Sequence, residues 1–598
     1  MDSAISGPLG QLSRQRTAPL ILELDLTDGL LEVRPPEPVA AIMSRHQPML
    51  TEIISGLRQA REDARVRALV VKVGSRPIGL GMVQELRDAI RRFGAAGKPT
   101  IAWADSFGEF SAGNVPYYLA TAFDTIYLQP SGDLGLTGLA VERTFLRGTL
   151  DLLGVQMQVG ARHEYKSAPE QLTERGFSGP AREATERISA SVTEQLAAAI
   201  AERRGVSAER AAELINGGPY LAEQALQAGL VDVLGYRDEV YAAVRRRVGP
   251  DAALLYLGRY QRSRELARRA RTLTAPRQEA VALIYATGSI RRGRSGRSPV
   301  SGPAMGSDSV TAALRAAAAD ARIRAVVLRV DSPGGSYVAS DSIWREVVRT
   351  RVGGKPVVVS MGDVAASGGY FISMAADVIF AQPGTVTGSI GVFSGKPVVA
   401  EMLGKAGVTT DAVVTGRHAN MFSTRHPFSD EEWAIVDAWL DHIYADFTGK
   451  VAAGRRLSAE RVHELARGRV WTGADARDRG LVDDLGGIED ATAVARTRAG
   501  LPATAPLVHF PRLGALERLR PASSSEDRRA AARLAAGGWD GALAGRAAGV
   551  AAAAVATAAG LPDRTALTEA WGPVWQAAAR LGLPAAGPLM LPGSWTFQ

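Results

Sequence analysis

The chain alternates between short apolar runs and longer amphipathic stretches. Ala325–Val330 (AVVLRV) and Pro356–Ser360 (PVVVS) are rich in β-branched residues and bounded nearby by Gly or Pro, which predicts buried strands. Ser340–Thr350 and Glu431–Ala453 repeat their apolar residues at helical spacing. Alternating strands and helices predict an α/β fold with mainly parallel sheets. In such sheets, sites form where the loops at the C-terminal ends of the strands converge.

Several of these segments occur twice, in the same order. The longest pair is identical at 7 of 11 positions, and the offset between copies drifts only from 257 to 251 residues. Four pairs match in register: 63–73 (DARVRALVVKV) with 320–330 (DARIRAVVLRV), 118–124 with 371–377, 207–210 with 458–461, and 225–235 with 476–486. The repetition predicts two homologous domains, at 18–250 and 279–500.

The segments outside the repeats have no counterpart. Residues 251–278 are rich in arginine and are predicted to form a basic helix and linker. Residues 505–598 are rich in Ala, Gly and Pro, and we expect a helical, Ala-rich extension of unknown role. Within it, Ala547–Pro562 is shorter than a membrane span needs, so a packed helix is favoured over membrane contact.

Composition excludes several kinds of site. The absence of cysteine excludes disulfides, thiolate metal sites and a cysteine nucleophile. The net charge of +8 is modest, and the basic stretches lack the interleaved aromatic residues that stack on bases, so solvated faces are favoured over a nucleic-acid patch. The seven histidines form no metal-binding spacing, and no metal or cofactor is expected.

Glycine-rich turns follow predicted strands in the second repeat. Asp331–Ser336 (DSPGGS) contains a Gly pair whose backbone N–H groups can hold a developing oxyanion. Gly362–Tyr370 (GDVAASGGY) presents Ser367 on a tight turn, and Val386–Gly391 (VTGSIG) forms a third turn. Each turn on its own is typical of an ordinary chain reversal.

The two repeats differ at these positions in a complementary way. Alignment places Gly334 opposite Pro77, which has no N–H to donate, and Ser367 opposite Asn114. The first repeat instead contains Lys166, in RHEYKS, where the corresponding stretch of the second repeat has no lysine. This pattern is what an active site shared between two domains would show.

A serine–lysine pair can perform acyl transfer. A serine hydroxyl needs a base to take its proton, and a neutral lysine amine can serve. The pKa of Lys166 would have to fall by about 3 units from about 10.4, which costs the ammonium form about 4 kcal/mol. Burial at a domain interface without a paired carboxylate would achieve this, and Ser389 is a candidate to orient the amine. Considered alone, Lys166 would be interpreted as a solvated surface residue.

Together these motifs resemble the signal peptide peptidase A (protease IV) family, in its long tandem-domain form, over about 20–500. The resemblance implies that Ser367 is the nucleophile and Lys166 the general base. It assigns Gly334 to the oxyanion hole, with the N–H of Ser367 or Gly368 as its partner, of which we take Gly368. It assigns Ser389 as the hydroxyl that orients the lysine.

The resemblance also implies a fold, a substrate and an assembly. The fold would be of the Clp protease and crotonase type. The substrates would be unstructured peptides such as cleaved signal peptides, with no nucleic acid, no metal and no cofactor involved. The assembly would be a homotetramer. Many members carry an N-terminal membrane anchor, but no apolar stretch of that kind occurs here, so we expect a cytoplasmic or peripherally membrane-associated enzyme.

Two other functions fit parts of the pattern. A crotonase-like acyl-CoA enzyme would use a backbone oxyanion hole without a Ser–Lys pair. A non-catalytic scaffold would bind peptides without cleaving them. Covalent capture of Ser367 by a peptidyl or fluorophosphonate reagent separates both from a peptidase.

Overall fold

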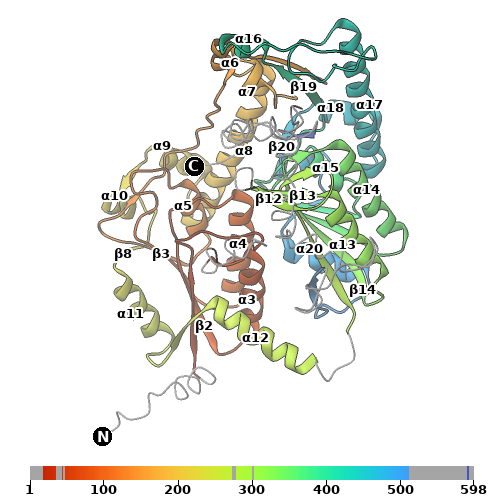
Figure 1. Ribbon diagram of the computed structural model, residues 1–598. Helices are drawn as coiled ribbons and strands as arrows, with labels where there is room; N and C mark the ends of the chain where they lie inside the picture. Colours follow the sequence, from red (N-terminus) through yellow and green to blue (C-terminus); the bar gives the residue numbers. More distant parts are fainter. Residues whose placement is uncertain are drawn as a thin grey trace, which may run out of the picture.

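The computed structural model describes residues 18–34, 44, 47–272, 278–298, 302–510 and 589–590. It confirms an α/β chain with two tandem repeats and mainly parallel sheets. Figure 1 shows the first repeat, red to yellow, beside the second, green to blue. Of the predicted C-terminal extension, only 505–510 and 589–590 lie within the described residues, and Ala547–Pro562 lies outside them. Leu507–His509 form a strand of the second sheet and not part of a helical extension, which corrects the prediction at that end. Among the described helices, none has both the length and the apolar character that a bilayer crossing requires.

The first repeat is built on a parallel six-stranded sheet in the order β8-β4-β3-β2-β1-β9. Its strands are β1 (Leu20–Asp25), β2 (Val66–Lys72), β3 (Thr100–Ala104), β4 (Thr125–Leu128), β8 (Val233–Leu234) and β9 (Ala253–Tyr256). Its main helices are α3 (Leu50–Glu62), α4 (Leu80–Gly94), α5 (Asn114–Ala120), α8 (Gly179–Arg204), α9 (Ala208–Asn216), α10 (Ala222–Gln227) and α11 (Arg237–Val248).

The segment predicted as a linker contributes to the first sheet. Its apolar start, ALLY, forms β9 and pairs with β1, and α12 (Leu257–Thr272) follows directly. The basic helix was expected there, whereas the added edge strand was not. The domain boundaries themselves stay predictions.

The second repeat has the same plan. The sheet order is β20-β18-β16-β14-β10-β22, with β17 beside β16 and β21 beside β17, and only the β18–β20 pair is antiparallel. Its strands are β10 (Ala280–Thr287), β14 (Ile323–Ser332), β16 (Val357–Ala366), β17 (Val378–Ala381), β18 (Val386–Gly388), β20 (Val470–Thr472), β21 (Asp484–Leu485) and β22 (Leu507–His509). Its main helices are α13 (Ser307–Ala319), α14 (Tyr337–Val352), α15 (Gly368–Ser373), α17 (Asp430–Arg455), α18 (Ala459–Leu465), α19 (Gly473–Asp478) and α20 (Ile488–Arg498).

The duplication extends to individual contacts. β1 pairs with β2, and β10 with β14, in parallel registers that shift after the first residue in both repeats. The turn before each inner strand is closed by one carboxylate. Asp63 accepts from Arg65 at 2.7 Å, and Asp320 accepts from Arg322 at 2.7 Å. Such detail at matched positions supports a common origin of the two halves.

The repeats share a hydrophobic core because the second sheet is buried on both faces. Along β10, Val281 and Leu283 join the core that also contains Leu50 and Leu86 of the first repeat. Ala282 and its alternate neighbours join the core of the second repeat. Successive side chains of a strand point to opposite faces, so one sheet serves both cores.

A buried ion cluster also crosses the interface between the repeats. Arg329 on β14 pairs with Glu32 and with Glu85 of α4, each at 2.8 Å, and donates to Ser360 Oγ at 2.8 Å. The Arg329 side chain is only 1% exposed, so these partners compensate for the lost hydration of its charge. Nearby, Met82 N–H at the start of α4 donates to the carboxylate of Asp363 on β16 at 2.9 Å.

Two smaller sheets complete the fold. β6 (Gln156–Ala161) of the first repeat pairs antiparallel with β19 (Phe393–Val398) of the second. These strands lie toward one end of the molecule with α6 (Arg147–Leu153) and α16 (Ala400–Lys405) (Figure 1). A five-stranded sheet has the order β12-β13-β11-β15-β23, formed by β11 (Ser289–Arg291), β12 (Gly296–Ser298), β13 (Gly302–Gly306), β15 (Gly334–Gly335) and β23 (Leu589–Met590).

Arg329→Met is expected to lower the free energy of unfolding by about 3–5 kcal/mol, because it leaves two buried carboxylates without their cation. Arg324→Met, on the same strand but half exposed beside Glu279, should change it by less than about 1 kcal/mol. Urea unfolding followed by tryptophan fluorescence measures both variants. Equal urea midpoints for the two variants would contradict a stabilising role for the ion cluster at Arg329.

Candidate active site

Ser367 lies between the end of β16 and the start of α15, on a turn with an unusual backbone. Its φ is 55° and its ψ is −114°, a region that side-chain-bearing residues seldom occupy. The turn is held at both ends, since Ser367 N–H donates to the Gly388 carbonyl at 2.8 Å and its own carbonyl accepts from Phe371 N–H at 2.9 Å. The side chain is fully buried. The fold therefore fixes the hydroxyl in one position.

Lys166 reaches Ser367 from the other repeat. Strand β6, just before Lys166 in the sequence, pairs antiparallel with β19 of the second repeat. Tyr165 N–H then donates to the Arg467 carbonyl of the second repeat at 3.1 Å. Lys166 Nζ lies 2.8 Å from Ser367 Oγ, 3.0 Å from Ser389 Oγ and 3.1 Å from the Ser389 carbonyl oxygen. The contact between the repeats therefore forms within one chain.

Burial controls the charge of Lys166. The residue is 2% exposed, and this burial lowers the pKa of its amine well below the usual range for lysine. Among the described residues, no carboxylate pairs with it. The nearest acid in sequence, Glu164, instead pairs with Arg467 at 3.0 Å. The amine therefore meets hydroxyl and carbonyl oxygens rather than a countercharge that would hold its proton.

The lysine passes through a slot that the sequence did not reveal. A Cβ on Gly468, where φ is +86°, would lie 2.4–2.6 Å from the N, Cα and Cβ atoms of Lys166. A Cβ on Gly391 would lie 3.2 Å from Lys166 Cδ. Both glycines are required by this close approach. An isolated glycine in a turn gives no signal that distinguishes a slot of this kind.

Ser389 also has an unusual backbone. Its φ is 51° and follows the positive φ of 78° at Gly388. Its N–H donates to the Arg469 carbonyl at 2.7 Å. This geometry directs both the hydroxyl and the carbonyl oxygen of one residue at Lys166 Nζ. The sequence singled out the hydroxyl, but the second contact follows only from the backbone.

The candidate oxyanion donors lie beside the serine. A Cβ on Gly368 would lie 3.0 Å from Gly334 Cα and 3.1 Å from Gly335 N, so the two turns touch. Gly334 N–H donates to Ser332 Oγ at 3.2 Å. Because Ser367 N–H is engaged by Gly388, Gly368 is the alternative for the second donor, and Gly334 N–H would have to leave Ser332 Oγ to reach an oxyanion. The N–H of Gly368 makes no hydrogen bond within the described part of the chain. The roles of both glycines stay predictions.

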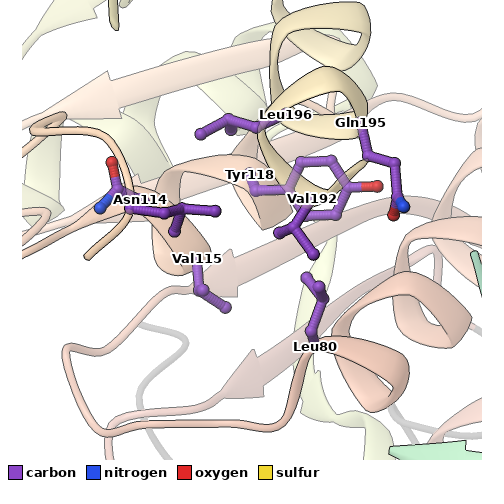
Figure 2. A pocket seen from close by; sticks show the side chains of 8 residues that line it. Leu80, Asn114, Val115, Tyr118, Val192, Gln195 and Leu196 are labelled. Atoms are coloured by element: carbon purple, nitrogen blue, oxygen red, sulfur yellow. The ribbon is translucent and has the colours of Figure 1, made fainter. Parts of the chain in front are cut away.

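The equivalent position in the first repeat has a structural role. Asn114 Oδ1 accepts from the N–H groups of Thr137 and Gly138, both at 3.1 Å, and its Nδ2 donates to the Gly138 carbonyl at 2.9 Å. Figure 2 shows Asn114 and Val115 beside a cavity of about 10 Å³, roughly the space of one water. Nothing in this arrangement provides a nucleophile.

Two half-buried carboxylates flank the turns of Gly334 and Ser367. Asp331 lies near the end of β14, just before the Gly334 turn, and burial raises its pKa to about 7. Asp363 lies on β16 ahead of Ser367, and burial raises its pKa to about 6. Asp331 accepts from Val364 N–H at 3.1 Å, which ties β14 to the strand that bears the serine.

Comparison with known proteins identifies the family of the chain. The family model of peptidase family S49 matches residues 92–249 and 349–502. The chain is 31% identical over 455 residues to "Serine protease SPPA, chloroplastic" of Arabidopsis thaliana, covering 76% of this chain and 66% of that protein. It is 33% identical over 463 residues to "Protease 4" of Salmonella typhi, covering 76% and 72%.

A shorter relative matches one region of the chain. This protein, "Putative signal peptide peptidase SppA" of Enterococcus faecium, is 38% identical over 172 residues, covering 29% of this chain and half of its own length. Among solved structures, ClpP1 of Listeria monocytogenes aligns with a TM-score of 0.24 at 15% identity, covering 35% of this chain and 94% of its own.

The fold and the extended matches define a serine protease. The chain belongs to peptidase family S49.

Gly468→Ala is expected to reduce kcat/KM for peptide hydrolysis by about 100-fold or more, because its Cβ would displace Lys166 from the serine. Gly480→Ala is the matched control. It also has a positive φ, +77°, but its Cβ would meet only Leu457 at 3.7 Å. Both variants carry a similar backbone strain. An equal loss of activity in the two would therefore contradict the claim that Gly468 is needed to make room for Lys166.

Proposed function

We propose that the chain is an endopeptidase or oligopeptidase that cleaves unstructured peptides by a serine–lysine mechanism shared between its two repeats. The observation that carries the proposal is the 2.8 Å contact between Lys166 Nζ and Ser367 Oγ. It lies within a buried site where the lysine has no countercharge among the described residues. A base of this kind is matched to a serine nucleophile near neutral pH.

The reaction proceeds by two acyl transfers. Neutral Lys166 takes the proton of Ser367, and the Oγ attacks the scissile carbonyl carbon. The N–H groups of Gly334 and Gly368 donate to the oxyanion of the tetrahedral intermediate. Lys166 gives its proton to the leaving amine, which leaves an acyl-enzyme on Ser367. Lys166 then deprotonates a water molecule, which hydrolyses the ester, and Ser389 keeps the amine aligned throughout.

The edge of β15 supports an extended peptide as the substrate. Gly334 and Gly335 pair antiparallel with Leu589–Met590 of the same chain, so this edge accepts a strand next to the candidate oxyanion donors. A folded protein cannot present its backbone in this way, whereas an unstructured segment can. Cleaved signal peptides fit this class, and the Enterococcus faecium relative, named a putative signal peptide peptidase, supports them as substrates.

The assembly and the membrane contact are also proposed. The resemblance implies a homotetramer, with peripheral rather than spanning contact with a membrane. Exposed apolar side chains gather on the segments near β6 and β19, which supports an interface there. They include Leu152, Val413, Phe422 and Trp439.

Ser367→Ala and Lys166→Met are each expected to reduce peptide hydrolysis by about 10⁴-fold or more while the protein stays folded. Lys396→Met is the matched control, because Lys396 is also buried but donates to the Met421 carbonyl. A quenched-fluorescence peptide assay measures all three. A fluorophosphonate reagent should label Ser367 in the parent chain and in Lys396→Met, but should not label Ser367→Ala or Lys166→Met. Full activity in Lys166→Met would exclude the shared dyad.

The pH profile should show a base with a lowered pKa. Only neutral Lys166 can accept the serine proton, so kcat/KM should rise with pH through the pKa of Lys166 and then become constant. Because burial lowers that pKa, the plateau should begin well below pH 10. A rate that continues to rise until pH 10.5, as for a solvated lysine, would contradict the proposed base. Peptide hydrolysis between pH 5 and 11 provides the test.

A further inference from the structure

The first repeat contains an apolar pocket that the catalytic mechanism does not use. Its volume is about 330 Å³, within the range of small-ligand pockets. Its floor consists of five buried apolar side chains, those of Leu26, Val73, Val83, Val115 and Leu119. Its rim is formed by exposed residues, Ser75, Arg76, Pro77 and Ser111. An apolar floor inside a polar rim suits a side chain that enters from solvent.

The pocket occupies the place in the first repeat that the candidate active site occupies in the second. The alignment offset of 257 residues places Pro77 and Ile78 opposite Gly334 and Gly335. The offset of 253 residues places Val115 and Pro116 opposite Gly368 and Gly369, directly after the nucleophile position. Pro77 lacks the N–H of an oxyanion donor, and Asn114 is held in structural hydrogen bonds. The first repeat therefore has a cavity at the place of the candidate active site, but it lacks the nucleophile and the oxyanion donor.

The loop beside the rim presents an exposed aromatic ring. Gly108, Glu109 and Phe110 have φ values of 139°, 44° and 62°, and the carboxylate of Asp133 accepts from the N–H groups of Glu109 at 3.0 Å and Phe110 at 3.3 Å. The Phe110 side chain is fully exposed and immediately precedes Ser111 of the rim. A strained loop that holds an aromatic ring in solvent is typical of a recognition surface.

The rim also carries a cation. Arg76 makes no hydrogen bond or ion pair with any residue that the structure describes. Two acids near this end of the sheet are engaged elsewhere, Asp105 with Lys72 at 2.8 Å and Asp133 with the Phe110 loop. A guanidinium beside an apolar pocket complements a carboxylate attached to an apolar side chain. The terminal residue of a peptide has both groups on one Cα.

We propose that this pocket is a second, non-catalytic site that binds the C-terminal residue of an apolar peptide. The side chain fills the pocket, and the terminal carboxylate pairs with Arg76. The inference rests on the proposed function in one respect, that peptides of this class are the enzyme's substrates and products. Peptides released by other peptidases carry such a free carboxylate and are ligands of this kind.

The test measures binding of fluorescein-Ala-Ala-Ala-Leu, as the free acid and as the C-terminal amide, by fluorescence anisotropy. The protein is the full chain with Ser367→Ala, so that no peptide is cleaved. The acid should bind about 10-fold more tightly than the amide, since only the acid pairs with the guanidinium. Ala112→Phe, which narrows the pocket, should weaken the binding of both peptides.

Arg76→Gln should bring the affinity for the acid down to that for the amide. Arg67→Gln, an exposed arginine on β2 away from the pocket lining, is the matched control and should leave both affinities unchanged. Equal affinities for acid and amide in the parent, or equal effects of the two arginine variants, would overturn the proposal. Hydrolysis that survives Ser367→Ala would overturn the proposed function but leave this binding result standing.

Discussion

The proposed mechanism requires that one buried amine reach from the first repeat to a serine in the second, and much of the architecture meets that requirement. The β6–β19 pair carries the lysine segment across, and Gly391 and Gly468 leave the space through which Lys166 passes. The shared core and the Arg329 cluster hold the repeats in one register. The same burial that makes the approach possible lowers the pKa of the amine, so position and basicity have one physical cause.

The two repeats agree in features of folding and differ at the candidate site. They share a register shift and the aspartate–arginine turn before their inner strands. Where the second repeat has Ser367, the first has Asn114, whose side chain is held by backbone groups, and the second repeat has no lysine at the place of Lys166. The shared features stabilise both halves, whereas each residue proposed for catalysis occurs in one half.

The sequence predicted the features that are local or repeated. The pattern of apolar residues located two strands and two helices of the second repeat, at β14, β16, α14 and α17. Comparison of the repeats selected Lys166 and Ser367, which the structure brings within hydrogen-bond distance. Features that depend on which segments lie close together in space could not be predicted from the sequence. Gly468 has no local signal, and the engagement of Ser367 N–H by Gly388 appears only when β18 lies beside the serine turn. The β9 edge strand was missed because a four-residue apolar run after a basic helix is weak evidence of pairing.

In the proposed mechanism, the crossing of the chain at β6 and β19 makes catalysis conditional on the whole molecule. The proposed nucleophile and its proposed base come from different halves, 201 positions apart in the sequence. A nascent chain that has completed only its first repeat contains no serine at the site. A chain nicked between the halves keeps activity only while the pieces stay together. A peptidase built in this way cannot act on its surroundings before its own folding is finished.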